Sequence, residues 1–360
     1  MYDCPEIFLS IIVPVYNCKV FIFQCIDSLY RQDVSVDSYE VIIVDDGSDN
    51  GAEKIVDEIQ KHYNNMRVIH KENGGVSSAR NEGIRYARGK YVWFIDADDF
   101  VAPNIFGKLK CIAYEKNSDR IKIDSYTFFD ELTFQQIEEM SINGRLKSNA
   151  PYKQLFATRT LYKREYLLKN DITFLEGVHY GEDGVFNYQT LIHNPKTDNS
   201  GILAYFYRKH AESVTMAPIE KKVKTSLNGA CSVLDVLVDD YNKKICLEQT
   251  RRMLLYWMYG ILDDYSVLDY DYFCENYSWN YCLNGIPIMD YELRKLHKDM
   301  IKISKYRDYN KLNRIISKKH KIDKRNKYKQ IAKKRNIGYL KHPKRLVKDV
   351  KNKYLFKENA

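Results

Sequence analysis

Residues 91–99 have the sequence YVWFIDADD, in which five apolar residues lead directly into three carboxylates. An uninterrupted apolar run of this length is typical of a strand that is buried on both faces of a sheet. We therefore expect a strand over 91–95, with Asp96, Asp98 and Asp99 just beyond its carboxyl end.

Strand-like and helical patterns alternate along the chain before this stretch. The apolar runs predict strands at 7–15, 40–44 and 67–69. Apolar residues at helical spacing predict helices at 20–30, 49–63 and 76–87. This alternation predicts an α/β fold, in which a mostly parallel, Rossmann-like sheet carries helices on both faces.

The remainder of the chain divides by composition. Predicted elements follow as a helix at 103–116, a strand at 121–129, a loop or small insertion at 130–150, and a strand at 202–207. From about residue 219 the pattern becomes helical and aromatic, and beyond residue 300 it is rich in lysine. We therefore predict an α/β domain over 1–218, a helical subdomain over 219–300 and a basic helical tail over 301–360.

The cysteines and the apolar stretches exclude several classes of protein. None of the eight cysteines lies in a CxxC pair, and no histidine cluster joins them, so neither a zinc site nor a disulfide framework is expected. The N-terminal residues lack the basic start of a signal peptide, and no stretch approaches 18 apolar residues. These features predict a cytoplasmic location.

The carboxylates after the strand at 91–95 are close enough to repel one another, which costs stability unless a cation neutralises them. Mg²⁺ and Mn²⁺ prefer oxygen ligands and commonly join one or two carboxylates to substrate phosphates. Asp96 and Asp98 are therefore candidate metal ligands, although an acidic turn or a helix cap would have the same sequence. The position favours the metal, because ligands of parallel sheets bind at the carboxyl ends of the strands.

Two other polar clusters, Tyr16-Asn17 and Asp45-Asp46, lie at the carboxyl ends of the predicted strands at 7–15 and 40–44. Asp45 and Asp46 end the strand at 40–44, where an acidic side chain can accept a hydrogen bond from a base or from ribose. Ser48 or Asp49 can instead cap the next helix, which leaves both carboxylates free.

The turn Asn73-Gly74-Gly75 opens the helix that carries Arg80. Its glycines allow a ligand to approach the backbone closely, and the arginine suits an anionic ligand. The segment is not a P-loop, because no GKS or GKT follows, and it does not have the GxGxxG spacing either. A capping turn with a surface arginine is the alternative.

In their order and spacing, these segments resemble those of the family 2 glycosyltransferases, which have the GT-A fold. The matching segments are SIIVPVYN at 10–17, EVIIVDDGS at 40–48, NGG at 73–75, ARNEG at 79–83 and DADD at 96–99. The match is strong over about residues 7–115. It continues more weakly at 162–164, 181–183, 207–208 and 213–215.

The resemblance implies a role for particular residues. The nucleotide-sugar donor is expected at Pro14, Tyr16, Asp45, Asp46, Gly74, Arg80, Asp96, Arg208 and Ser213. A divalent Mn²⁺ or Mg²⁺ is expected at Asp98, at Asp96 and at His210, which could instead be an exposed loop histidine. The pair Glu182-Asp183 is expected to supply the catalytic base, and Asp183 is the preferred residue of the two.

These roles predict an inverting, hexosyltransferase-type glycosyltransferase. It would move a sugar from a nucleotide-sugar, preferably a UDP-sugar, to a hydroxyl of a glycan or lipid-linked acceptor in bacterial surface polysaccharide synthesis. The metal and Arg208 would neutralise the leaving diphosphate, and one base with direct displacement would invert the anomeric carbon.

Two other functions are considered. A degenerate nucleotide- or glycan-binding domain is disfavoured by the joint presence of Asp46, Asp96, Asp98 and Asp183. A sugar-1-phosphate nucleotidyltransferase would have a glycine-rich, basic loop after its first strand. This chain has Tyr16-Asn17-Cys18 there instead.

The charge distribution suggests further partners. The net charge is +9, but residues 301–360 alone carry 22 Lys or Arg and 4 Asp or Glu, so the preceding 300 residues are acidic overall. The tail could attach the enzyme peripherally to an anionic membrane, bind an anionic acceptor polymer, or be a solvated basic helix. Residues 219–300 could shape the acceptor site or mediate oligomer formation. No nucleic acid is expected as a partner.

Overall fold

The computed structural model describes residues 7–129, 136, 156–178, 181–210, 291–306 and 311–318, together with scattered positions between 233 and 258. The chain divides into two compact units, Met1–Met253 and Leu254–Ala360.

In the described part of the first unit, eight strands form one mixed sheet in the order β3-β2-β1-β4-β7-β6-β8-β5. The strands are β1 (Leu9–Val15), β2 (Tyr39–Asp45), β3 (Met66–His70), β4 (Tyr91–Phe94), β5 (Phe100–Val101), β6 (Arg120–Phe129), β7 (Thr160–Lys163) and β8 (Thr197–Lys209). The first four are parallel to one another, while β7 runs antiparallel to both of its neighbours. The parallel half is the region in which the strand–helix alternation was clearest.

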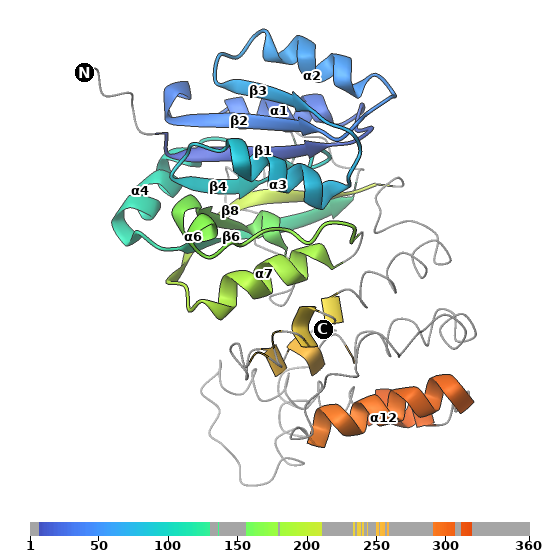
Figure 1. Cartoon of the computed structure of the whole chain (residues 1–360). Coiled ribbons are helices and arrows are strands. Elements are labelled where there is room, and N and C mark those ends of the chain that lie inside the picture. The colour runs from blue at the N-terminus through green and yellow to red at the C-terminus, as the bar shows by residue number, and fades with distance from the viewer. Residues whose placement is uncertain are drawn as a thin grey trace, which may run out of the picture. The chain divides into compact units, whose positions relative to one another are not determined.

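Helices cover both faces of this sheet (Figure 1). Among the described helices of the first unit are α1 (Ile22–Tyr30), α2 (Ala52–Gln60), α3 (Val76–Tyr86), α4 (Phe106–Lys116), α6 (Arg164–Lys169) and α7 (Glu182–Ile192). Alternate residues of β1 enter different cores. Ile11 packs with residues of α1, α2 and α4, whereas Ile12 packs with residues of α3, α6 and α7. The α/β fold with helices on both faces is therefore confirmed.

Every strand and helix predicted before residue 129 is present, with bounds shifted by a few residues. The segment from 156 to 192 was not resolved into elements in the sequence analysis, and it contains β7, α6 and α7. These elements are hard to detect because β7 has four residues and α6 has six. The predicted strand at 202–207 is the interior of the longer β8.

In the second unit, α12 (Tyr291–Tyr306) and residues 311–318 are helical, in keeping with the predicted helical C-terminal region. The predicted boundaries at 218 and 300 stay predictions, and almost all of the predicted loop at 130–150 lies outside the described residues. Among the described helices, none is both long and apolar enough to cross a membrane.

Candidate active site

The parallel strands β1, β2 and β4 end at one edge of the sheet (Figure 1). Asp45 ends β2 and Asp46 follows it, while Asp96 lies just beyond β4. Tyr16 follows β1 and is 55% exposed, whereas Pro14 is buried inside that strand. The three predicted polar clusters therefore meet at this edge, which is where ligands of parallel sheets bind.

The Asp46 carboxylate organises the glycine turn. It is buried and accepts hydrogen bonds from Lys71 Nζ at 2.7 Å, Gly74 N at 3.0 Å and Gly75 N at 2.7 Å. A Cβ at Gly74 would lie 2.8 Å from Ser78 Oγ, so the turn needs a residue without a side chain there. A carboxylate offers about four lone-pair positions. About one therefore remains for a ligand, counting the bonds from described residues.

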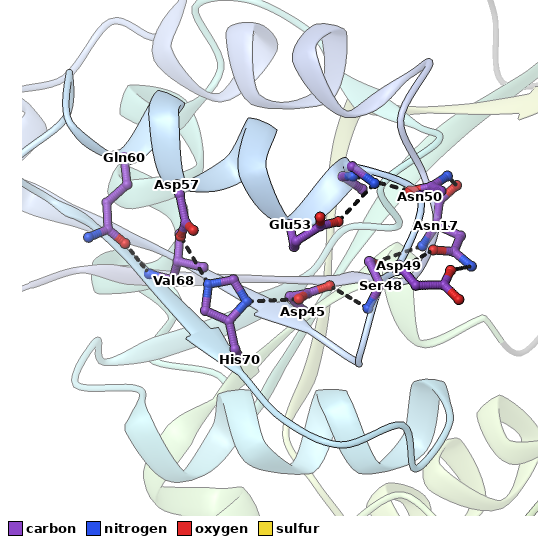
Figure 2. Close-up of polar contacts among 12 residues, drawn as sticks. Asn17, Asp45, Ser48, Asp49, Asn50, Glu53, Asp57, Gln60, Val68 and His70 are labelled. Carbon is purple, nitrogen blue, oxygen red and sulfur yellow. Dashed lines mark hydrogen bonds and ion pairs between the residues drawn. The ribbon is translucent and has the colours of Figure 1, made fainter.

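His70, at the end of β3, lies between two carboxylates (Figure 2). Its Nδ1 is 2.8 Å from Asp45 Oδ2, and its Nε2 is 2.9 Å from Asp57 Oδ1. The hydrogen bond with Asp45, followed by that with Asp57, raises the pKa of His70. Both ring nitrogens can donate only in the imidazolium, so this geometry favours the charged form.

The loops after β1 and β2 are joined by hydrogen bonds (Figure 2). Asn17 N donates to Ser48 Oγ at 2.9 Å, and the Asn17 side chain exchanges two 3.0 Å hydrogen bonds with Asp49. Asn17 has a φ of 54°, a left-handed conformation that asparagine tolerates better than most residues. Ser48 N in turn donates to Asp45 Oδ1 at 3.1 Å. These hydrogen bonds hold the ends of β1 and β2 together.

Arg80 joins two parts of the site that are far apart in sequence. Its side chain is 3% exposed, with Nη2 at 2.7 Å from Asp96 Oδ1 and Nη1 at 3.1 Å from Asp183 Oδ1. Nη1 also lies 3.6 Å from Glu182 Oε1, and the guanidinium carbon lies 5.1 Å from the centre of the Phe174 ring. The fold therefore brings the predicted catalytic base close to the predicted metal motif.

Glu182 and Asp183 form the first turn of α7, where the helix dipole favours negative charge. Burial is the main reason why the pKa of Asp183 is raised to about 7. Arg80 opposes that rise, while Glu182 and Asp96 add to it. A carboxylate whose pKa lies near neutrality is well matched to general base catalysis at neutral pH.

Asp99 fastens β8 to the metal motif. It is buried and accepts hydrogen bonds from Arg208 N at 2.7 Å and from the Tyr205 hydroxyl. Arg208 Nε also donates to the carbonyl oxygen of Asp98 at 2.9 Å, and its guanidinium carbon lies 4.5 Å from the centre of the Phe21 ring. Burial, followed by repulsion from Asp98, holds the pKa of Asp99 well above its ordinary value.

His210, which follows β8, faces the second carboxylate of the motif. Its Nε2 lies 3.0 Å from Asp98 Oδ2, and its ring packs on that of Phe21 with centroids 4.6 Å apart. Burial and repulsion from Asp96 raise the pKa of Asp98, while His210 opposes the rise. With a side chain only 10% exposed, His210 is not an exposed loop histidine.

Comparisons with known proteins identify the family to which the chain belongs. The family model described as Glycosyl transferase family 2 matches residues 10–167. The chain is 31% identical over 272 residues to EpsJ of Bacillus subtilis (strain 168), an uncharacterized glycosyltransferase, and the match covers 68% of this chain and 77% of that protein. The chain belongs to glycosyl transferase family 2.

The fold of this family 2 member is similar to that of a solved GT-A enzyme. The crystal structure of Staphylococcus aureus TarS 1-349 in complex with UDP-GlcNAc superposes with a TM-score of 0.61, covering 87% of this chain and 92% of that one at 19% identity. The GT-A fold predicted from the sequence is therefore confirmed. In sequence, the chain is 28% identical to TarS of S. aureus (strain Mu50), a poly(ribitol-phosphate) β-N-acetylglucosaminyltransferase, and spans 36% of its length.

The acidic residues that this family 2 site presents fit a divalent cation. Among the described residues, no three His, Cys, Asp or Glu side chains form a cluster that could hold a metal by themselves. Asp98 and His210 lie together, while Asp96 is held by Arg80. Mg²⁺ typically takes one or two carboxylates and completes its coordination with water and substrate phosphates. Two or three protein ligands at this edge are consistent with that pattern.

The structure places the predicted site residues at one edge, with two qualifications. Ser213 lies outside the described residues, and Arg80 is directed at carboxylates instead of standing open to an anion. The sequence analysis missed His70 and Tyr205. His70 could have been found from its place at the end of the strand after Asp45, whereas no local signal marks Tyr205.

Proposed function

We propose that the chain is a metal-dependent, inverting glycosyltransferase that transfers a sugar from a UDP-sugar to a hydroxyl of a glycan or lipid-linked acceptor. The observation that carries this proposal is the Arg80 bridge, which holds Asp96 and Asp183 on one guanidinium. It brings a donor-side carboxylate and a base candidate, 87 residues apart in sequence, into the same site.

The nucleotide would bind at the ends of β1, β2 and β3. Asp46 keeps about one acceptor position beyond its bonds to Lys71, Gly74 and Gly75. An imide N–H of uracil would donate to it, whereas adenine and cytosine present a ring nitrogen that can only accept. The exposed ring of Tyr16 offers an apolar face for the base. The UDP-GlcNAc complex of the TarS fold relative supports this choice of nucleotide.

Asp98 and His210, with Asp96, would hold a Mn²⁺ or Mg²⁺ ion. A bound cation would neutralise charge on the departing diphosphate. Arg208, which is fixed by Asp99 and Asp98 behind the motif, adds positive charge to the same region. This assignment explains why three carboxylates, of which Asp98 and Asp99 have raised pKa values, are kept at one turn.

Asp183 would take the proton of the acceptor hydroxyl as that oxygen attacks the anomeric carbon. With a pKa raised to about 7, the carboxylate is both ionised to a useful extent at neutral pH and basic enough to accept a proton. A single base and direct displacement by the acceptor oxygen invert the anomeric configuration. Arg80 would keep the Asp183 carboxylate oriented while leaving it unprotonated.

The acceptor class is suggested by relatives. One is the poly(ribitol-phosphate) β-glucosyltransferase of Bacillus spizizenii, which is 28% identical over 227 residues, and the match covers 34% of that protein. We infer that the chain takes part in assembling a surface polysaccharide or teichoic acid. The basic tail over 301–360 would keep it on the cytoplasmic face of an anionic membrane, at about 1 kcal/mol per Lys or Arg near the surface.

The test is a screen of nucleotide sugars with the full chain, read by thermal shift and by nucleotide release. UDP-sugars should stabilise the protein only when Mn²⁺ or Mg²⁺ is present, and slow UDP release should be lost in Asp98→Ala. Indifference to every nucleotide, with or without metal, would refute the proposal. Metal-dependent binding without release or transfer would instead support the degenerate binding domain.

A further inference from the structure

One arginine near the active-site carboxylates lacks a hydrogen bond or ion pair to its guanidinium from any described residue. Arg159 ends the short turn η2 (Ala157–Arg159), and its guanidinium carbon lies 4.4 Å from the centre of the Phe156 ring. Burial lowers its pKa, which means that the charge is partly desolvated. A desolvated charge without a partner is costly, and such charges are usually paired.

The turn η2, which carries Arg159, also lies beside Asp183, the proposed catalytic base in the first turn of α7. The backbone N–H of Ala157, at the start of η2, lies close enough to the Asp183 carboxylate to lower its pKa. Asp183 and Asp99 are among the charges that act on Arg159. The guanidinium therefore lies within electrostatic range of the carboxylate that must meet the acceptor hydroxyl.

The aromatic residues beside Arg159 link it to the metal motif. The ring of Tyr207 stacks with that of Phe156, with centroids 6.2 Å apart and an interplanar angle of 21°. Tyr207 lies two residues beyond Tyr205 on β8, and the Tyr205 hydroxyl donates to Asp99. Because side chains two apart share a face of a strand, both tyrosines lie on the side that faces the site.

The sheet separates this group from the nucleotide. The ends of β1, β2 and β3 lie on one side of β4, and β7, which η2 precedes, lies on the other. A donor bound along the first three strands reaches β4 with its diphosphate and sugar. With the donor in that proposed position, the acceptor would approach from the β7 side, where Asp183 and Arg159 are.

We propose that Arg159, Phe156 and Tyr207 form an acceptor subsite that binds an anionic group, a phosphate or a carboxylate, on the acceptor glycan. The inference rests on the proposed transferase function and deepens it by naming the acceptor class. The planar guanidinium matches a phosphate or carboxylate with two parallel hydrogen bonds. The stacked rings offer an apolar face to the adjoining polyol or sugar ring. The bound anion would make hydrogen bonds to the guanidinium that no described residue makes.

The experiment measures binding of three probes to the full chain by calorimetry, with and without saturating UDP and Mn²⁺. The probes are ribitol 5-phosphate, glucuronate and uncharged ribitol, which separate a phosphate from a carboxylate and both from the polyol alone. The wild-type protein should bind at least one anionic probe about tenfold more tightly than ribitol, and Arg159→Gln should remove that preference. Arg159→Lys should restore only part of it, because an ammonium lacks the planar fork.

The matched control is Arg85→Gln, since Arg85 has a 73% exposed side chain and lies on α3. It should leave all three affinities unchanged, and Arg159→Gln should leave UDP affinity unchanged. Equal binding of charged and neutral probes by the wild type, including no binding of either, overturns the subsite. So does a loss of UDP binding in Arg159→Gln as large as the loss for the anion. If UDP fails to bind the wild type while the anion preference stands, the donor assignment fails and the subsite survives.

Discussion

The two halves of the active-site edge treat their carboxylates differently. At the ends of β2 and β3, Asp46 is surrounded by two backbone N–H groups and a lysine, and Asp45 accepts from Ser48 N and from His70. Beyond β4, by contrast, the carboxylates crowd one another, and the pKa values of Asp98, Asp99 and Asp183 are all raised. In the first half, which we call the frame, hydrogen bonds from described residues occupy most of the acceptor positions of Asp45 and Asp46. In the second half, the negative charge of the carboxylates is only partly compensated.

This difference teaches what each half does. A frame whose acceptors are nearly all occupied can fix the shape of a base pocket, and it changes little when the ligand binds. A group of carboxylates that raise one another's pKa values gains free energy from any cation or proton that arrives. Arg80 is the built-in part of that compensation, and a metal and the acceptor proton would supply the rest.

The largest expected effect comes from removing the base in the crowded half. Asp183→Asn should lower kcat by about 100- to 10,000-fold, because an amide cannot take the acceptor proton. The KM for the UDP-sugar should change by less than about threefold, since Asp183 does not belong to the nucleotide frame. Initial rates of sugar transfer at saturating acceptor measure both parameters.

Glu182→Gln is the matched control for Asp183→Asn, because it alters the neighbouring carboxylate on the same turn of α7. It should retain most of the activity. Equal losses in the two variants would mean that the negative charge of the turn matters and that the proton acceptor has been misassigned.

Arg80→Met tests whether the Arg80 guanidinium compensates the negative charge of Asp96 and Asp183. Removing a buried guanidinium from between Asp96 and Asp183 leaves carboxylates unpaired, which should cost about 3–5 kcal/mol of unfolding free energy. The loss of a nearby cation should also raise the pKa of Asp183 above about 7, so the acidic limb of the pH–rate profile should move to higher pH.

Urea unfolding measures the stability effect of Arg80→Met, and kcat/KM from pH 5 to 9 measures the shift. Arg85→Met, which removes an exposed arginine from the same helix, should do neither. A pH profile that stays in place while stability falls would limit Arg80 to a structural role.

How far the sequence could predict this contrast depends on the distance between partners. The acidic residues after each strand and the glycine turn were found because they lie next to apolar runs that identify strands. The role of Arg80 was not found, because its partner Asp183 is 103 residues away and on a helix that the sequence analysis did not identify. A helix that begins with Gly181 and two carboxylates has the same local pattern as an acidic turn.

The partners of Arg208 and His210 were also not predictable from the sequence. The family resemblance marked both residues, but only the antiparallel pairing of β5 with β8 explains how they come to lie beside Asp98. β8 also pairs with β6, and that pairing includes a bulge between residues 122 and 125, which hydrophobic alternation does not reveal. Local chemistry was therefore predictable, and the partners across the sheet were not.

A smaller effect on stability and UDP affinity is expected from removing a hydrogen-bond donor of the frame. Lys71→Met removes one of the three donors to Asp46 and leaves the two backbone N–H groups in place. The unfolding free energy should fall by about 1–3 kcal/mol, and UDP affinity should weaken by about threefold to tenfold. Calorimetric titration with UDP and urea unfolding measure the two changes. A larger loss of stability than in Arg80→Met would reverse the proposed contrast between the halves.

The smallest effect concerns His70, which lies between two carboxylates of the frame. Hydrogen bonds with Asp45 and Asp57 raise the folded-state pKa of His70 above its ordinary value of 6.5. The stability that they contribute is therefore complete below about pH 6.5 and is lost as the pH rises through the folded-state pKa. Because the side chain is 45% exposed, solvent screening limits the contribution to less than about 1 kcal/mol. His70→Gln should lower the melting temperature at pH 5.5 more than at pH 8.5, while His62→Gln, which changes an exposed histidine just after α2, should leave it unchanged at both. A His70→Gln effect that is independent of pH would show that the charge of His70 does not stabilise the frame. Charge would then matter only for the carboxylates beyond β4.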